Sequence, residues 1–524
     1  MPSSVLSPVL AVGAVLLVTY FFPKYICWRN RMVKLNAIPT MGNSGLFSSY
    51  ISAQRYKDHA LEIIQEGYCK YPGGAFKIPL LDRWDVIVSG EKMIDDIRKA
   101  SPLDLSFIAA FSEDMQTDYT MGKVVRVNTY HVPVVRSPLT RALPARFHDL
   151  RDEVVASFAD FVPAKESEWM KVPMLSTIMQ IVSRTSNRYF VGLPLCMSFA
   201  CHSSIPIDVK TKAGTRTTSR NLNITFTVDA VIGGTTLQRY PGFLKPIVSQ
   251  FLTNVPASLA RAEGHLGPLI RERLAKEKEH GTSDWPDKPN DLVTWLLEEV
   301  GERNENIVSD IVHRVLLVNF AAIHTTSMTF TNSIYYLAAY PQIAEPLREE
   351  VSAAIEELGW TKAAMSKMVK LDSFLKETQW LSGVNGVGMT RMALRDFTFS
   401  DGTVVPAGTI VAVASQALHY DGAYYEDPET FKPFRFSNLR EQEGESLKHQ
   451  MAAVDPAFVV FGGGRPMCPG RFFAVNELKA LMGHVLLTYD VEFENNKGIP
   501  PPSWHGVAYS PNRSAEVMFR KRAV

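Results

Sequence analysis

The stretch from Ile311 to Tyr340, IVHRVLLVNFAAIHTTSMTFTNSIYYLAAY, limits most strongly how this chain can fold. Wound as a helix, it is apolar on nearly every face, and such a helix is buried in the centre of a large fold. Its polar residues gather at the middle, at His324, Thr325 and Thr326. Taken alone, this cluster is typical of a core histidine and of threonines that bond to carbonyls of the preceding turn. The sequence therefore predicts a long central helix with a polar midpoint.

The remaining periodicity predicts a mainly helical α+β fold. A helix is expected over Gln54–Tyr68 and others over most of residues 146–355, of which DLVTWLLEEVG (Asp291–Gly301) is a clear example. Short strands are expected over Gly74–Leu80, Trp84–Gly90 and, with two turns, Asp396–Ser415. The 46% hydrophobic content is that of a globular protein with a large core.

Charge and cysteine content argue against a nucleic-acid-binding protein and against a disulfide-stabilised one. The net charge is +1, so no nucleic-acid partner is expected. The five cysteines are odd in number and irregularly spaced, which argues against a disulfide framework and for a reducing compartment. They are Cys27, Cys69, Cys196, Cys201 and Cys468.

The N-terminus predicts a membrane anchor. Val5 to Phe22 carries no charge and is close to the length that crosses a bilayer as a helix. Basic residues follow it, which favours a cytoplasmic position for the rest of the chain. We therefore expect an anchor over residues 1–23, a basic, Pro- and Gly-containing linker over 24–48, and one large catalytic domain over 49–524.

The polar stretch from Met197 to Arg220 interrupts this pattern. It is rich in serine and threonine, has no period and separates two apolar segments. A structureless loop of this length is uncommon inside a compact domain. Two interpretations stay open, a surface insertion and translated non-coding sequence from a misread gene boundary.

A single cysteine lies in an unusual run near the C-terminus, FGGGRPMCPGR, Phe461 to Arg471. A helix is expected directly after it, over Arg471–Tyr489. A helix N-terminus and the cations Arg465 and Arg471 are expected to lower the pKa of the Cys468 thiol. One thiolate serves zinc and iron–sulfur sites poorly but is sufficient as the axial ligand of haem.

This run resembles the haem-binding signature of the cytochrome P-450 monooxygenases, Phe-x-x-Gly-x-Arg-x-Cys-x-Gly. Phe461, Gly464, Arg465, Cys468 and Gly470 match it. The resemblance implies that Cys468 is the axial ligand of the iron of haem b and that Arg465 pairs with a haem propionate. It also implies the fold of that family, a large helical domain with a long central helix and a smaller β-rich part.

The middle of the central helix resembles the oxygen-activation motif of the same family. In AAIHTT, Thr325 takes the position of the threonine that directs protons to oxygen and Thr326 completes the pair. His324 replaces the usual acid and Ala322 the usual glycine; a histidine can also relay protons. This form of the motif is similar to that of fungal members of ent-kaurene-oxidase type that oxidise terpenoids.

Further elements of the family concern the haem and its support. Arg391 stands where a second propionate-binding arginine is often found. The usual Trp-x-x-x-Arg haem contact is absent, and Arg136 or Arg141 in VVRSPLTR is expected to serve instead. Arg435, in FKPFRF, matches the Pro-x-Arg-Phe element.

One element departs from the family's pattern. In LKETQWL, Glu377 is present and can pair with Arg435, but Trp380 stands where the Glu-x-x-Arg element has its arginine. This departure predicts a looser support of the cysteine loop. It leaves open a non-catalytic haem binder, beside a thiolate-haem isomerase or dehydratase.

The resemblance implies a monooxygenase of the endoplasmic reticulum membrane. It would receive electrons from NADPH-cytochrome P-450 reductase, with cytochrome b5 as an additional donor, and would oxidise a hydrophobic terpenoid or meroterpenoid with molecular oxygen.

Overall fold

The computed structural model describes residues 26–27, 29–45, 48–193, 209–210, 216–217, 222–281, 284–300, 306–496 and 498–523. The predicted anchor at residues 1–23 and most of the 197–220 segment lie outside these residues. Of that segment, only β5 (Val209–Lys210) and β6 (Arg216–Thr217) are described, as a short antiparallel pair. The chain forms two compact units, one with the residues up to Ala110 and Val387–Ala417, the other with Phe111–Gly386 and Leu418–Val524. The predicted domain limits stay a prediction.

The first unit is built on a five-stranded sheet in the order β1-β2-β10-β7-β3. β2 runs parallel to β10, and the other neighbours are antiparallel. A hairpin of two short strands, β8 and β9, lies beyond β7 in the sequence. The predicted strands of this region are confirmed. The bounds are β1 Ala75–Pro79, β2 Trp84–Val88, β3 Leu105–Ser106, β7 Gly388–Ala393, β8 Phe397–Thr398, β9 Val404–Val405 and β10 Ile410–Val413, with helices α2 Ser48–Lys70 and α3 Glu91–Lys99.

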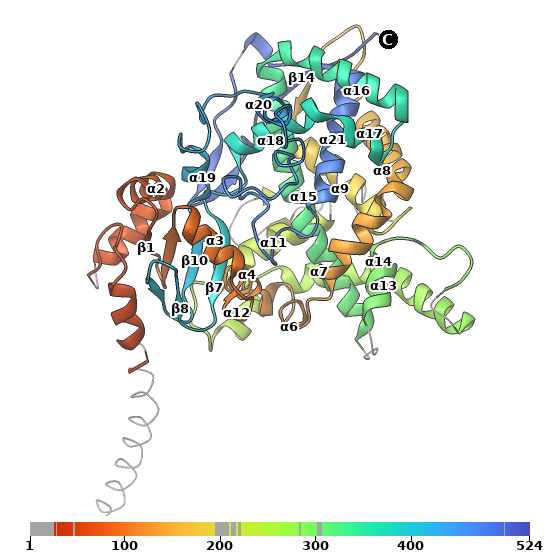
Figure 1. The fold of residues 1–524 in the computed structure, drawn as a ribbon. Coiled ribbons are helices and arrows are strands. Elements are labelled where there is room, and N and C mark those ends of the chain that lie inside the picture. The colour runs from red at the N-terminus through yellow and green to blue at the C-terminus, as the bar shows by residue number, and fades with distance from the viewer. Residues whose placement is uncertain are drawn as a thin grey trace, which may run out of the picture. The chain divides into compact units, whose positions relative to one another are not determined.

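The second unit is mainly helical (Figure 1). Its main helices are α8 Thr140–Phe161, α9 Met174–Phe190, α11 Leu222–Leu237, α12 Lys245–Leu252, α13 Val255–His280, α14 Leu292–Glu299, α15 Ile307–Ala339, α16 Ala344–Leu358, α17 Lys362–Lys367, α18 Val369–Ser382, α20 Arg435–Arg440 and α21 Arg471–Thr488. Strands β4 (Met170–Pro173), β14 (Glu516–Lys521) and β11 (Tyr489–Glu492) form a small sheet, and β12 (Ser503–His505) pairs with β13 (Ala508–Ser510). The mainly α prediction is confirmed.

The shorter helical elements connect these parts. They are α4 Phe107–Met115, α5 Thr117–Thr120, α6 Val124–Val127, α7 His131–Val134, η1 Val135–Leu139, η2 Pro341–Ile343, α19 Ser415–His419 and η3 Glu494–Asn496. Of these, η1 is a π-helix that contains Pro138. A proline has no N–H to donate, so the wider turn of a π-helix suits this position.

Helix α15 is the predicted central helix, and most of its residues are buried. Among the described residues, it is the one helix long and apolar enough to cross a membrane, with 61% of its most apolar window buried inside the fold. This burial is what a core helix shows. Helices α9, α13, α18 and α21 all contact it, so the core of the second unit is assembled around α15.

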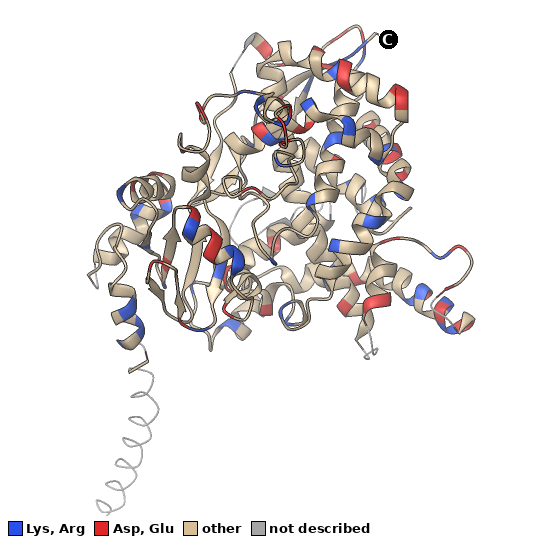
Figure 2. Cartoon of the chain, viewed as in Figure 1, with Lys and Arg blue, Asp and Glu red and all other residues tan. Residues whose placement is uncertain are grey.

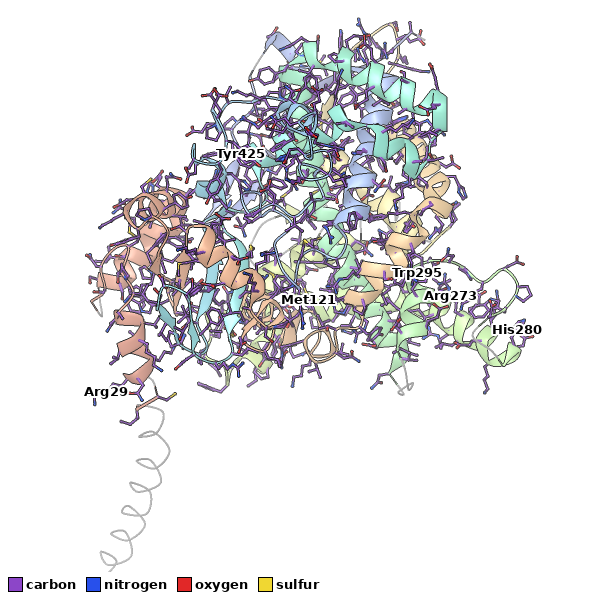
Figure 3. All side chains as sticks on the ribbon, viewed as in Figure 1. Arg29, Met121, Arg273, His280, Trp295 and Tyr425 are labelled. Carbon is purple, nitrogen blue, oxygen red and sulfur yellow. The ribbon has the colours of Figure 1, made fainter. Side chains whose placement is uncertain are left out.

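Helix α14 confirms the helix expected at 291–301 and shows how the sequence starts it. Asp291 caps it by accepting a hydrogen bond from the Thr294 backbone N–H at 3.1 Å. Arg273 of α13 then donates to both Asp291, at 2.6 Å, and the Thr294 hydroxyl, at 2.8 Å. Figure 3 labels Arg273 and Trp295 at this junction of α13 and α14.

Charged side chains of both signs alternate along the helices of the second unit, as the outer end of α13 shows in Figure 2. This view shows no large area of one sign, in line with the net charge of +1.

Candidate active site

The cysteine run folds as a tight loop immediately before α21. The Cys468 backbone N–H donates to the Phe461 carbonyl at 2.9 Å, and the Met467 N–H donates to the Gly464 carbonyl at 3.2 Å. Gly462 and Gly464 have φ of 73° and 71°, which is the left-handed region that glycine adopts without strain. The loop thus depends on glycine at these two positions, and it places Cys468 three residues ahead of the helix.

Cys468 is partly buried, and its sulfur receives two backbone N–H groups, those of Gly470 and Arg471. Burial raises the pKa of the Cys468 thiol, and the two N–H groups together with the Arg471 charge oppose that rise. The prediction of a lowered pKa was wrong, because removing the thiolate from water outweighs the helix terminus and the cation. A bound metal cation would supply the missing stabilisation of the thiolate.

The middle of α15 is open on one side, although the helix is otherwise buried. Ala321 and Thr325 are exposed and Ala322, His324 and Met328 are partly so, while the turns before and after are buried. Residues spaced by three and four lie on one face of a helix. The predicted distal residues thus lie at an exposed stripe in the middle of a helix that is otherwise mostly buried.

The three predicted distal residues have different surroundings. The Thr325 hydroxyl donates to the Ala321 carbonyl at 2.8 Å, whereas Thr326 is buried. Burial lowers the pKa of His324 to about 4, so its imidazole is neutral near pH 7. Its Nε2 is buried and has no hydrogen-bond partner within the part of the chain that the structure describes.

Helix α21 lies against α15 in the fold. Before the open stripe, Val315 and Leu316 of α15 share a core cluster with Phe473 of α21. After it, Phe330 shares a second cluster with Leu478. The structure therefore places the helix that follows Cys468 alongside the helix that carries Thr325.

Two arginines of the second unit lie at the cysteine loop. Arg465 is exposed, and Arg136, in η1, donates from Nη2 to the Arg465 carbonyl at 3.1 Å. Burial lowers the pKa of Arg471, and the nearby charge of Arg136 lowers it further. Arg141 is exposed, and of the two candidates left open by the sequence, Arg136 is the one at the loop.

Arg391 lies in β7 of the first unit, where burial lowers its pKa to about 10. Its guanidinium donates to the Thr390 carbonyl at 2.9 Å and lies 5.9 Å from the centre of the Phe107 ring. The predicted contact of Arg391 with a haem propionate stays a prediction.

Glu377 and Arg435 form a buried ion pair. Arg435 donates from Nε to Glu377 at 3.0 Å and from Nη2 at 3.1 Å, and the Lys432 backbone N–H adds a bond at 2.9 Å. Arg435 also donates to the carbonyls of Glu426, Asp427 and Thr430. The predicted pairing of the two charges is geometrically confirmed, and it ties α18 to the irregular segment before α20.

Trp380 stands at the position of the missing arginine and is part of an aromatic cluster. It is 1% exposed, and its Nε1 donates to the Pro428 carbonyl at 3.0 Å. Its ring is stacked on His419 at 4.7 Å and on Phe458 at 6.2 Å, and Tyr425 meets it edge-on at 4.7 Å. The indole is fully packed and its one donor is satisfied, while the predicted looser support of the cysteine loop stays a prediction.

Lys376, which sequence reasoning missed, supplies a cation to the same cluster. Its ammonium lies 4.2 Å from the centre of the Phe436 ring, 4.7 Å from that of Phe458 and 3.6 Å from a carboxylate oxygen of Asp455. Tyr425, labelled in Figure 3, donates to the same carboxylate at 2.9 Å. Asp455 and Phe458 lie in the segment that leads directly into the cysteine loop. The cluster therefore fixes the chain just before that loop. Lys376 directly precedes Glu377, but no sequence pattern marks its partners.

Glu477 of α21 was also missed. It is fully buried, and Ser186 and Thr185 of α9 donate to its Oε1 at 2.8 and 2.9 Å. Burial raises the pKa of Glu477 to about 7. The regular spacing of α21 gives no signal that this residue faces another helix instead of solvent.

These residues fit a haem held by one thiolate. A single, partly buried cysteine receives two N–H groups at the start of a helix, and two arginines lie at its loop. An open stripe of the neighbouring helix holds a threonine and a neutral histidine. This donor set defines the class of haem-thiolate proteins.

Comparison with known proteins agrees with this class. A family model described as Cytochrome P450 matches residues 211–518. Cytochrome P450 monooxygenase 103 of Postia placenta is 42% identical over 497 residues, which cover 94% of this chain and 95% of that protein. Cytochrome P450 monooxygenase CYP512U6 of Ganoderma lucidum is 34% identical over 93% of this chain and 92% of its own length, and paxQ of Penicillium paxilli is 29% identical over 94% and 93%. The chain belongs to the cytochrome P450 family, and it is a monooxygenase of that family with a haem-thiolate cofactor.

Proposed function

We propose that this monooxygenase, anchored in the endoplasmic reticulum membrane, oxidises a hydrophobic terpenoid or meroterpenoid intermediate of secondary metabolism. Its electrons would come from NADPH through NADPH-cytochrome P450 reductase, with cytochrome b5 as a further donor. The observation that carries the proposal is that α21, the helix after the Cys468 loop, packs against α15, whose midpoint is exposed at Ala321 and Thr325.

Cys468 would hold the iron, and Arg465 and Arg136 would pair with the propionates. When bound, haem with a thiolate ligand would supply the chemistry that cleaves molecular oxygen and inserts one oxygen atom into a C–H bond. The loop contributes a fixed sulfur position, because Phe461 and Gly464 hold it through backbone hydrogen bonds. The N–H groups of Gly470 and Arg471 temper the electron density of the sulfur.

Thr325 and His324 would deliver protons at the open stripe. Thr325 is exposed while its hydroxyl donates to the Ala321 carbonyl, so its oxygen can accept a further hydrogen bond at the stripe. His324 is neutral, which leaves one ring nitrogen free to accept a proton while the other releases one. Thr325 and His324 would thus deliver protons with a histidine in place of the usual acid.

The character of the substrate is inferred from the side chains on and beside the stripe. Ala321 and Ala322 leave room beside Thr325, and Phe320 meets the ring of Phe111 edge-on at 6.2 Å. Apolar walls around few polar groups favour a hydrophobic substrate. The uncharged Val5–Phe22 segment favours a membrane location, which also suits such a substrate.

The test is the reduced, carbon-monoxide-bound absorption spectrum of the protein in microsomes, compared between wild type, Cys468→Ser and Cys69→Ser. We expect the strongly red-shifted Soret band of a thiolate ligand in the wild type and in Cys69→Ser, whose cysteine is exposed, and its loss in Cys468→Ser. Wild-type microsomes with the reductase should then convert members of a terpenoid panel only when NADPH and oxygen are present.

Absence of the band in well-expressed wild type would show that the protein is a non-catalytic member of the family. Turnover of a terpenoid without NADPH would instead indicate an isomerase or dehydratase.

A further inference from the structure

A row of buried polar atoms without partners runs along α15. His324 Nε2, Ser327 Oγ and Thr331 Oγ1 are each buried and have no hydrogen-bond partner among the residues described. The three residues are spaced by three and four, so they lie one above another on one face of the helix. Ser327 and Thr331 are fully buried. Polar atoms buried in this way are normally satisfied, and ordered water is the usual partner where protein groups are absent.

The same face of α15 leads to the molecular surface. Tyr335 is the next residue of the row, four positions after Thr331, and its hydroxyl donates to the Asn512 carbonyl at 2.9 Å. Asn512 lines a surface cavity of about 300 Å³. Phe493, whose ring centre lies 5.9 Å from that of Tyr335, lines it as well. The row therefore extends from the open stripe at His324 to a cavity that solvent enters.

The hydroxyls on the opposite side of α15 are arranged differently. Ser333 donates to the Thr329 carbonyl at 3.0 Å and shares a second hydrogen bond of 2.9 Å with Thr378. Thr378 also donates to the Leu375 carbonyl at 2.9 Å. These hydroxyls are satisfied by protein groups and need no water. Among the described buried hydroxyls of α15, the unsatisfied ones thus lie on the row from His324 to Tyr335; the helix also carries unsatisfied buried amide atoms at Asn319 Oδ1 and Asn332 Nδ2.

We propose that Tyr335, Thr331, Ser327 and His324, bridged by buried water, form a path that carries protons from the cavity at Asn512 to Thr325. The inference rests on the proposed function, in which protons are consumed at this stripe. His324 takes the place of the usual acid. The row explains how a neutral imidazole at that position receives protons.

The transfer conserves protons at every group. A hydronium ion in the cavity gives a proton to the file of water and hydroxyl groups. Each oxygen accepts a proton on a lone pair and releases its own proton to the next group. His324 accepts the proton on one ring nitrogen and releases one from the other, toward Thr325. The row is then restored by reorientation of its O–H bonds, and no oxidant or reductant takes part.

The first experiment asks whether the row is hydrated, and it does not depend on activity. The thermal midpoint of unfolding is measured for the full-length holoprotein in detergent, with Ser327→Ala and Thr331→Val against wild type. If water bridges the row, each change removes a partner of that water and lowers the midpoint by a few degrees. If the row is dry, each change removes an unsatisfied buried hydroxyl and raises the midpoint, which would overturn the proposal.

The second experiment asks whether the row carries protons. NADPH oxidation is measured with the reductase in H₂O and in D₂O. We expect the ratio of the two rates to rise at least twofold in Ser327→Ala and Thr331→Val. It should stay unchanged in Ser333→Ala, the matched control, and in Thr331→Ser, which keeps the hydroxyl. If Thr331→Val does not fold, Ser327→Ala tests the row by itself. An unchanged ratio in the first two variants would overturn the proposal, even where the wild-type carbon monoxide spectrum upholds the proposed function.

Discussion

The rings of Trp380 and His419 lie nearly parallel, 16° apart, with their centres separated by 4.7 Å. His419 is fully buried and its Nδ1 lies 3.3 Å from the Trp380 carbonyl. Burial lowers the pKa of His419 to about 4, so the stacked ring is neutral near pH 7. The two residues join α18 to α19, and through Phe458 to the segment before the cysteine loop. An aromatic stack thus takes over the support that an arginine gives in the family pattern.

Replacing Trp380 is expected to weaken the protein and its hold on haem. Trp380→Ala should lower the free energy of unfolding by about 3–5 kcal/mol, because it leaves a cavity in a packed cluster. Trp380→Arg should also destabilise, because it places a second cation beside the buried Lys376 and removes the stack. Both effects are measured by thermal unfolding and by haem content per protein.

Trp380→Phe is the matched control for that prediction. It keeps a ring on His419 and loses the bond to the Pro428 carbonyl, so its cost should be about 1 kcal/mol. A gain of haem in Trp380→Arg would contradict the supporting role of the aromatic cluster and would favour a decayed protein.

Glu477 makes stability depend on pH. Burial raises its pKa from 4.5 to about 7, so its contribution is fully present below about pH 4.5 and is lost as the pH rises through about 7. The shift corresponds to roughly 3 kcal/mol. Glu477→Gln, which cannot ionise, should match the wild type near pH 5 and exceed its unfolding temperature by several degrees at pH 8.

The control for the titration is Glu299→Gln, which alters an exposed carboxylate and should follow the wild type at both pH values. Parallel curves for wild type and Glu477→Gln between pH 5 and 8 would show that Glu477 does not titrate in this range.

Arg136 is expected to help retain haem through its bond to the Arg465 carbonyl. Arg136→Gln should accelerate haem transfer to an excess of apomyoglobin about fivefold, since a hydrogen bond of this kind contributes about 1 kcal/mol. Arg141→Gln, at an exposed arginine of the neighbouring helix α8, should transfer haem at the wild-type rate. Equal rates in the two variants would place Arg136 outside the haem site.

Thr325 is expected to act in proton delivery and not in stability. Thr325→Val removes the hydroxyl at the open stripe, and we expect the hydrogen peroxide released per NADPH oxidised to rise roughly tenfold, within the range for loss of a proton-transfer group. The unfolding temperature should hardly change, because Thr325 is exposed. Thr326→Val, at a buried neighbour, should leave the peroxide ratio near that of the wild type; a reversal of the two results would exchange their roles.

Much of the fold could be predicted because its signals are local. The run around α15 is too apolar to lie anywhere but in the core, and Asp291 marks the start of α14 by its capping side chain. The Cys468 loop was equally predictable, because only glycine adopts the backbone of Gly462 and Gly464 without strain. The pairing of Glu377 with Arg435 followed from the family pattern.

Properties that depend on distant neighbours could not be predicted. Trp380 suggested a defect until its partners His419, Phe458 and Tyr425, all at least 39 positions away, were seen around it. The Cys468 pKa was predicted with the wrong sign, because the helix terminus is visible in the sequence and the burial of the sulfur is not.

By itself, the sequence determined the class of protein, the glycine loop around Cys468 and the long central helix, because glycine loops, helix caps and apolar periodicity act over a few residues. Only the tertiary structure decided that an aromatic cluster replaces an ion pair at Trp380. It also decided that Glu477 is buried against α9 and that His324, Ser327 and Thr331 share one buried face that ends at Tyr335 and Asn512. The physical reason is that desolvation and packing depend on which distant segments surround a side chain, and chain folding alone brings those segments together.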